Sequence, residues 1–159
     1  MKSNNEKARA IIRANRYMSL ATSAGGEPWV APVAYAYDEH FNLFWYSEKT
    51  AQHSRHIEIN DSVVVAIFNS QASSDEVDGL QISGKAAEVA PSQLPTIVEL
   101  YFRQSFTDEA VRDRWSKPAE CFMGDAPQRF YRFKPFSVFK CDTECTSVDR
   151  RMLVDLTAD

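Results

Sequence analysis

The segment best suited to chemistry covers residues 44–60, FWYSEKTAQHSRHIEIN, where an aromatic strand-like run meets a predicted helix. Ser47 ends the aromatic run, and Lys49, Thr50 and His53 follow it. Backbone N–H groups and the positive end of the helix dipole meet at such a junction, which favours an anion. The two hydroxyls, the ammonium group and the imidazole would complete a phosphate cradle. Alternatively, Ser47 or Thr50 only caps the helix while Lys49 and His53 are solvated, and spacing alone does not decide between these readings.

Other chemistries find less support in the sequence. His53 and His56 have the i, i+3 spacing of a metal pair, but no acidic or cysteine neighbour accompanies them, so no metal site is predicted. Cys121, Cys141 and Cys145 are odd in number and lack zinc-site spacing, so we expect reduced thiols. No serine lies in a nucleophile elbow, and Gly25-Gly26 lacks the lysine and spacing of a phosphate loop.

Composition limits the class of protein. The chain has 159 residues, 44% of them hydrophobic, and a formal charge of −4. These values predict one globular domain over residues 1–159. No apolar stretch is long enough for a membrane span, and residues 1–16 are too polar for a secretory signal, so we expect a cytoplasmic protein without membrane contact. Scattered basic residues argue against a nucleic-acid partner.

The elements around the cradle are mostly strands. Residues 17–23 and 29–37 predict a hairpin across Gly25-Gly26, with Pro32 at an edge or bulge. Further strands are expected at 41–47, at 63–68, which reads as fully buried, at 79–89 with a bulge at Gly84, and at 129–134 and 136–141, broken by Pro135. Helices are expected at 3–15, 48–60, 91–106 and 107–115, the last capped by Thr107. Residues 143–159 carry no clear signal.

This order predicts a mainly β (α+β) fold, a closed or partly closed antiparallel β-barrel of about six to seven strands with flanking helices. The aromatic stripe formed by Tyr101, Phe102, Phe106 and Trp115 is typical of a core or dimer interface, although it could instead cover a ligand from a partner subunit.

The chain also resembles a known family. SLATSAGGEPWVAPVAY, FNLFWYS, KTAQHSRHIEIN, VVVAIF and LQISGKA follow one another between residues 18 and 87, and their order is similar to the pyridoxamine 5′-phosphate oxidase-like flavoproteins of the FMN-binding split barrel. RFYRFKPFSVFKCD is similar to the closing strands of that family. The resemblance implies a homodimeric split β-barrel with FMN at the subunit interface, touched by both chains.

The resemblance also implies roles for individual residues. Backbone groups near the isoalloxazine edge would come from Val30, Ala31, Pro32, Val33 and Tyr35. The flavin and ribityl chain would be lined by Trp45, Tyr46 and Ser47, and the phosphate would be held by Lys49, Thr50 and His53. Gln81 would approach the ring from a neighbouring strand. No catalytic residue is assigned.

Two departures from the family pattern change the expected function. Oxidase members usually have an Arg-Lys pair where this chain has Gln52-His53, so the cradle is less cationic and its strength should depend on pH. The arginine and histidine motif that holds the substrate phosphate is not found, since Arg129 and Arg132 lie within a predicted strand. Oxidation of vitamin B6 is therefore not expected.

The leading hypothesis is an FMN-dependent oxidoreductase, in which hydride or electrons pass between FMN and a small-molecule substrate or a nicotinamide donor. A second hypothesis is a flavin-binding or sensing protein without turnover. A third is a split barrel that binds another flat cofactor, haem or a deazaflavin, for which the less cationic cradle is the hint.

Overall fold

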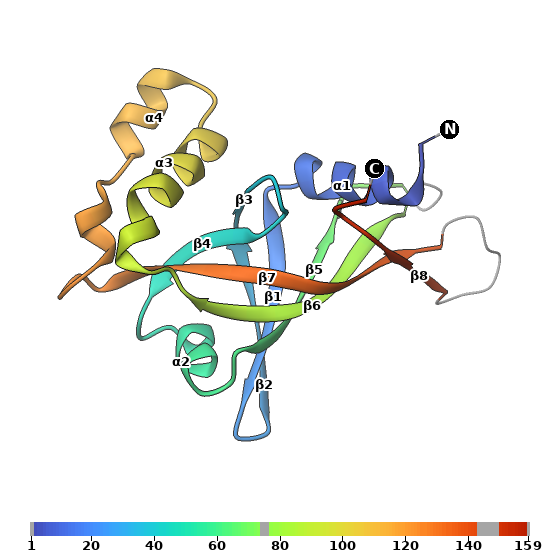
Figure 1. Cartoon of the computed structure of the whole chain (residues 1–159), viewed down its shortest axis with the longest axis horizontal. Helices are drawn as coiled ribbons and strands as arrows, with labels where there is room; N and C mark the ends of the chain where they lie inside the picture. Colours follow the sequence, from blue (N-terminus) through green and yellow to red (C-terminus); the bar gives the residue numbers. More distant parts are fainter. Residues whose placement is uncertain (1, 74–76, 143–149, 159) are drawn as a thin grey trace.

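The centre of the molecule is one curled antiparallel sheet. The computed structural model describes residues 2–73, 77–142 and 150–158. The strands are β1 (Tyr17–Ala24), β2 (Glu27–Ala34), β3 (Ala36–Tyr37), β4 (Leu43–Glu48), β5 (Ser62–Phe68), β6 (Gly79–Glu88), β7 (Gln128–Cys141) and β8 (Arg151–Val154). Their order is β2-β1-β5-β6-β7-β4-β3, and β8 pairs with β7 (Figure 1). The predicted antiparallel half-barrel is confirmed, and β3 and β8 bring the described sheet to eight strands.

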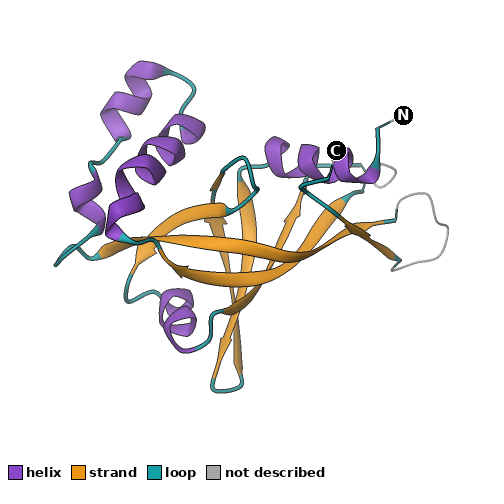
Figure 2. Ribbon diagram, viewed as in Figure 1, coloured by secondary structure: helices purple, strands orange, loops and turns teal. Residues whose placement is uncertain are grey.

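Helices flank this sheet, as Figure 2 shows. They are α1 (Asn4–Ala14), α2 (Gln52–Ile59), α3 (Leu94–Ser105) and α4 (Glu109–Trp115), with short 3-10 turns η1 (Pro91–Gln93) and η2 (Ala119–Phe122). α3 and α4 lie at one end of the sheet, α1 lies at the other, and α2 follows β4. Among the described residues, no helix combines the length and apolarity that crossing a bilayer requires.

Glycine and proline residues lie at the turn, the edge and the bulge that the sequence predicts for the sheet. Gly25 and Gly26 have φ of +59° and +84° in the β1–β2 turn, a conformation that glycine adopts without strain. Pro32 lies on β2, the edge strand that pairs with β1. The β6–β7 register shifts between Ser83 and Gly84, which confirms the predicted bulge.

Pro135 does not divide the last long strand, so the prediction of two strands was wrong. It pairs with Gly84 at the register shift, where the ladder is already irregular and the missing proline N–H is tolerated. β4 begins at Leu43 rather than at residue 41, because Phe41 adopts a left-handed φ of 58° in the preceding turn. α4 is capped by Asp108, which accepts from the Val111 N–H at 2.9 Å, and not by Thr107.

Two apolar cores lie on opposite faces of β4. Leu43 and Trp45 point into the barrel core, while Phe44 and Tyr46 pack under α3. The second core includes Tyr101, Phe102 and Phe130, so the aromatic stripe is core as predicted, except for Trp115, which is 58% exposed. Residues 143–149 and 159, and Cys145 with them, lie outside the described residues.

The prediction that strand 63–68 is buried on both faces was wrong for the single chain. On β5, Val63, Val65 and Ile67 point into the barrel. Val64 and Phe68 point the other way and are 47% and 51% exposed. One side of the sheet therefore presents apolar side chains to its surroundings.

Candidate functional site

The site centres on the first turn of α2. The helix begins at Gln52, four residues later than predicted, after a turn that leaves β4. Within the described structure its N-cap, Ala51, is not accompanied by a side-chain cap, so neither Ser47 nor Thr50 serves in that role. The first-turn N–H groups are therefore left for another acceptor, at the positive end of the helix dipole.

Ser47 and His53 lie against each other at this helix end. The hydroxyl Oγ of Ser47 is 2.8 Å from Nε2 of His53, and the histidine is buried. Burial, reinforced by the neighbouring His56, lowers the pKa of His53 below its ordinary value. The imidazole is consequently neutral at neutral pH. The pair offers a hydroxyl and an uncharged ring to a ligand, in place of a fixed cation.

Lys49 and Thr50 lie in the connection between β4 and α2. The backbone N–H of Lys49 donates to the carbonyl of Pro127 at 2.9 Å, which fixes this turn against the start of β7. The Thr50 hydroxyl is exposed and lies 3.5 Å from a carboxylate oxygen of Glu48. Lys49 is the cation that lies between Ser47 and His53 in sequence, and the acidic side chain of Glu48 precedes it on the same turn.

Sequence reasoning missed a second buried pair of contacts on α2. His56 was considered from the sequence as half of a metal pair, and the structure buries it, with 4% of its surface exposed. Its Nε2 is 2.8 Å from Nε2 of Gln52, and its Nδ1 is 3.2 Å from the hydroxyl of Thr22 on β1. With the amide of Gln52 donating, His56 carries its proton on Nδ1 and donates to Thr22. The i, i+4 spacing of Gln52 and His56 was the available signal.

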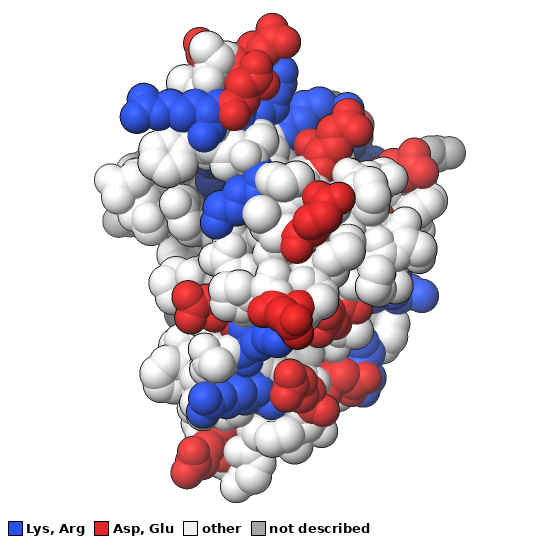
Figure 3. All heavy atoms as spheres, turned by 90° about the vertical axis from the view of Figure 1, so that its left-hand side faces the viewer, with Lys and Arg blue, Asp and Glu red and all other residues white. Residues whose placement is uncertain are grey.

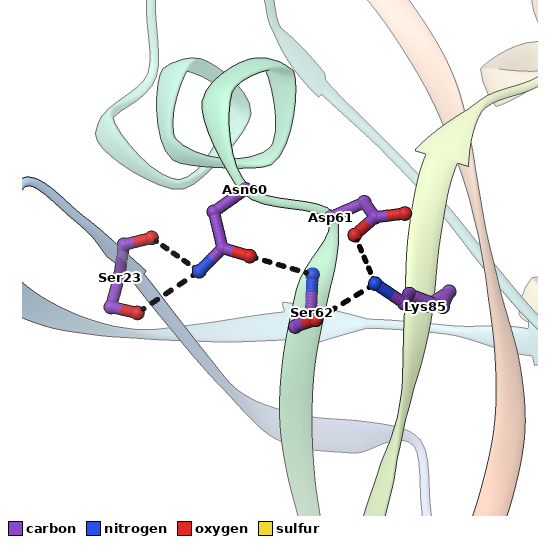
Figure 4. Close-up of polar contacts among 5 residues, drawn as sticks. All are labelled: Ser23, Asn60, Asp61, Ser62 and Lys85. Atoms are coloured by element: carbon purple, nitrogen blue, oxygen red, sulfur yellow. Dashed lines mark hydrogen bonds and ion pairs between the residues drawn. The ribbon is translucent and has the colours of Figure 1, made fainter.

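The far end of α2 is anchored by a polar cluster that Figure 4 shows. The side-chain amide of Asn60 donates to the carbonyl of Ser23 at 3.1 Å, and its oxygen accepts from the N–H of Ser62. Lys85 on β6 pairs with Asp61 and donates to the Ser62 hydroxyl at 2.9 Å. These contacts tie the helix to β1, β5 and β6, and so fix the direction of its first turn.

Three of the predicted cofactor-site residues place their side chains in the cores. Tyr35 donates its hydroxyl to the Ile12 carbonyl at 2.7 Å, and burial raises its pKa. Trp45 is fully buried, with its ring centroid 5.5 Å from that of Tyr131. Tyr46 packs in the core under α3.

Val30, Pro32 and Gln81 lie on the exposed side of the sheet, which we call the outer sheet face. Its residues pair in two rows across the strands: Pro32, Ser19, Ala66, Gln81, Phe139 and Leu153, and Val30, Ala21, Val64, Ser83 and Ser137. Ala31 and Val33 alternate to the opposite side, where Val33 packs against the barrel core. The carboxamide oxygen of Gln81 is 3.3 Å from the guanidinium of Arg151.

The structure does not bring Gln81 to the Ser47–His53 pair within one chain. Ser47 pairs with Arg129 and Gln81 pairs with Phe139, ten residues further along β7. Ten residues of extended strand have a contour length of about 33 Å, so the two residues lie well apart along the curled sheet.

Arg129 lies directly across from Ser47 but is already engaged. Its Nε is 2.9 Å from a carboxylate oxygen of Glu88, and its other nitrogens donate to the carbonyls of Gly124, Ala126 and Gln128. It therefore holds the loop before β7. In the part of the chain that the structure describes, no group of three or more metal-ligating side chains gathers.

Comparisons with known proteins agree with this fold. The model of the family described as pyridoxamine 5′-phosphate oxidase matches residues 5–140. No curated protein sequence matches the chain.

Similar solved structures include a heme binding protein from Mycobacterium smegmatis (TM-score 0.71, 17% identity, covering 96% of this chain and 58% of that one). They also include an FAD-binding protein from Mesorhizobium loti (0.63, 20%, 84% and 91%) and General Stress Protein 26 from Bacillus anthracis (0.60, 21%, 87% and 93%). The chain thus spans little more than half the length of the mycobacterial protein, and these likenesses show the fold. Through the family match over most of its length, the chain belongs to the pyridoxamine 5′-phosphate oxidase family.

Proposed function

We propose that this protein binds flavin mononucleotide and passes hydride or electrons between it and a small substrate or a nicotinamide donor. The observation that carries the proposal is the Ser47–His53 pair at the uncapped first turn of α2, in a chain of this family. Helix N-termini with free N–H groups and adjacent hydroxyls are suited to phosphate.

The donor set fits the phosphate of the cofactor. Ser47, Thr50 and His53 supply neutral hydrogen-bonding groups, and Lys49 supplies one ammonium group on a flexible stem. When bound, the flavin would supply the redox chemistry, while the chain's own residues bind and orient it. Because His53 is neutral at neutral pH, a phosphate dianion bound there favours its protonation, so binding takes up a proton.

The proposal includes a homodimer with the cofactor between the two copies. The outer sheet face exposes Val64, Phe68 and Val30, a grouping typical of an interface. Gln81, on β6, pairs with Phe139, which lies ten residues along β7 from Arg129, the partner of Ser47 in the same chain. In a homodimer, the second copy can bring its Gln81 to that cofactor.

A haem-binding function is the second candidate. The neutral state of His53 weakens the case for a dedicated phosphate site, and a protein that shares the fold is described as binding heme. The two candidates differ in their ligand, because FMN carries a phosphate group and haem does not.

The test compares FMN with riboflavin, which lacks the phosphate. Titration of the purified protein with each flavin, followed by flavin fluorescence, should give at least about tenfold tighter binding of FMN, because charge-assisted hydrogen bonds contribute roughly 1.5–3 kcal/mol each. Parallel titration with haem, followed by its Soret band, tests the second candidate. Equal affinity for the two flavins would contradict a phosphate cradle, and saturable haem binding without flavin binding would favour haem.

A further inference from the structure

α4 is a short helix with little to hold it. It spans Glu109–Trp115, and in the described structure none of its side chains is buried. Val111 and Trp115 are 41% and 58% exposed. Isolated helices of this length are unstable in water, and most helical stability in proteins comes from packing. The apolar side chains of α4 therefore contribute little to a core in the described structure.

A groove of about 580 Å³ separates α4 from α3 and from the segment leading to η2. Its apolar lining comes from α3 and from residues just before or in η2: Pro95, Val98, Phe102, Pro118 and Ala119. Val98 and Phe102 also belong to the core under α3, so the floor of the groove is continuous with a fixed part of the fold. This volume is typical of small-molecule sites.

Cationic groups stand around this floor. Arg103 and Arg112 line the groove together with Lys117, against two acidic residues, Glu99 and Glu120. Figure 3 looks onto this end of the molecule and shows basic side chains gathered with acidic ones at its upper part, which α3 and α4 form.

Arg112 is the cation best placed for a ligand. Its side chain is only 29% exposed, and its ion-pair partner, Glu109 at 3.7 Å, is 83% exposed. Arg103 pairs with Glu99 at 3.9 Å, with both side chains more than half exposed. Exposed pairs of this kind contribute little energy, so an incoming anion can displace Glu109 at small cost. A half-buried guanidinium beside an apolar floor is complementary to a carboxylate that carries an apolar body.

We propose that the α3–α4 groove binds an organic anion with an apolar body, of the class of a medium-chain carboxylate. Its carboxylate pairs with Arg112, and its hydrocarbon part covers the exposed Pro95 and Pro118, with the buried Val98 and Phe102 beneath them. This site lies on the other face of β4 from the Ser47–His53 pair, because Tyr46 packs under α3 while Ser47 contacts α2. The inference is therefore independent of the flavin proposal.

The test uses decanoate as the probe and calorimetric titration of the full chain. Wild type should bind decanoate saturably and more tightly than the neutral decanol. Arg112→Met keeps an apolar stem but removes the charge, and should weaken decanoate binding roughly tenfold and abolish the preference over decanol. Arg114→Met is the matched control, since Arg114 is an exposed arginine of the same helix that contacts the Trp115 ring instead of the groove, and it should bind as wild type does.

A second variant keeps the test decisive if Arg112→Met fails to fold. Ser116 is exposed and lines the groove, so Ser116→Trp should fill it and prevent decanoate binding without disturbing a core. The proposal is overturned if wild type shows no saturable binding, if the two arginine variants lose affinity equally, or if Ser116→Trp binds decanoate as wild type does.

Discussion

Ser47 Oγ and His53 Nε2 lie 2.8 Å apart, and this contact joins the end of β4 to the first turn of α2 across six residues of sequence. This contact holds the helix N-terminus beside a strand hydroxyl, where the backbone donors of the helix remain uncapped. Burial lowers the pKa of His53, so the imidazole at this site is neutral. Phosphate binding at this site therefore depends on hydrogen bonding more than on charge.

The first prediction concerns the phosphate of FMN. His53→Ala should weaken FMN binding severalfold while leaving riboflavin affinity nearly unchanged, because the lost hydrogen bond reaches the phosphate, and Ser47→Ala should weaken FMN binding more than riboflavin binding. Fluorescence titration of both flavins measures the ratio. Arg55→Lys, an exposed residue of the same helix whose charge is kept, serves as the control. A parallel loss for both flavins would mean that the pair supports the fold and not the phosphate.

The second prediction concerns pH and stability of the ligand-free protein. The pKa of His53 is lowered by burial, so below about pH 6.5 the unfolded chain binds a proton that the folded chain resists. The contribution of neutral His53 to stability is present above the pKa that this histidine has in the unfolded chain. It is lost as the pH falls towards the lower pKa that His53 has in the folded chain. Urea unfolding at pH 7.5 and 5.5 should therefore show lower stability at pH 5.5, and His53→Gln should reduce this difference. An unchanged difference in the variant would assign it to other groups.

Much of the fold was predictable from local signals in the sequence. Gly25-Gly26 between two strand-like runs predicted the β1–β2 hairpin, and Gly84 predicted a bulge that the register confirms. Pro135 led to the wrong prediction of a strand break. A proline is tolerated there because it lies opposite the bulge at Gly84, and that pairing joins residues far apart in sequence. Phe41 misled as well, since an aromatic residue in a strand-like run gives no sign of a left-handed turn.

The candidate site was predictable in part. Their spacing in the sequence predicted that Ser47 and His53 belong to one phosphate cradle, and the structure places the two side chains in contact. The contact from His56 to Thr22 was not predictable, because it joins a helix to a strand 34 residues earlier. The neutral state of His53 also needed the structure, since burial sets it.

The third prediction tests the bulge. A Cβ at Gly84 would overlap the Lys134 carbonyl oxygen and lie 2.7 Å from the ring of Phe133, which is fully buried. Gly84→Ala should destabilise the protein by about 3 kcal/mol or more, since β7 must shift. Thermal or urea unfolding measures the loss, with Ser83→Ala on the exposed side as the control. A loss below about 1 kcal/mol would show that the strands separate easily here.

The fourth prediction tests the buried contact of His56. Thr22→Val keeps the shape of the side chain but removes the acceptor of the Nδ1 proton, leaving a buried donor unpaired. The variant should lose about 1–3 kcal/mol of stability. Thr107→Val, at an exposed position, should change stability little. If the two variants unfold alike, the Thr22–His56 bond contributes no net stability.

The fifth prediction tests the homodimer. Val64 lies in the middle strand of the rows on the outer sheet face, so Val64→Glu should place a charge in the proposed interface and yield monomers. Val111→Glu, a comparably exposed valine on α4, should leave the assembly unchanged. Sedimentation velocity distinguishes the two states. A wild-type monomer, or a dimer that survives Val64→Glu, would exclude this face as the interface.

The most direct measurement of the central claim is an absorption spectrum of the purified protein between 300 and 550 nm, followed by FMN titration with fluorescence detection. Our account predicts a yellow protein, or saturable quenching of FMN fluorescence that is at least about tenfold tighter than for riboflavin. A colourless protein that leaves FMN fluorescence unchanged at all concentrations would contradict it.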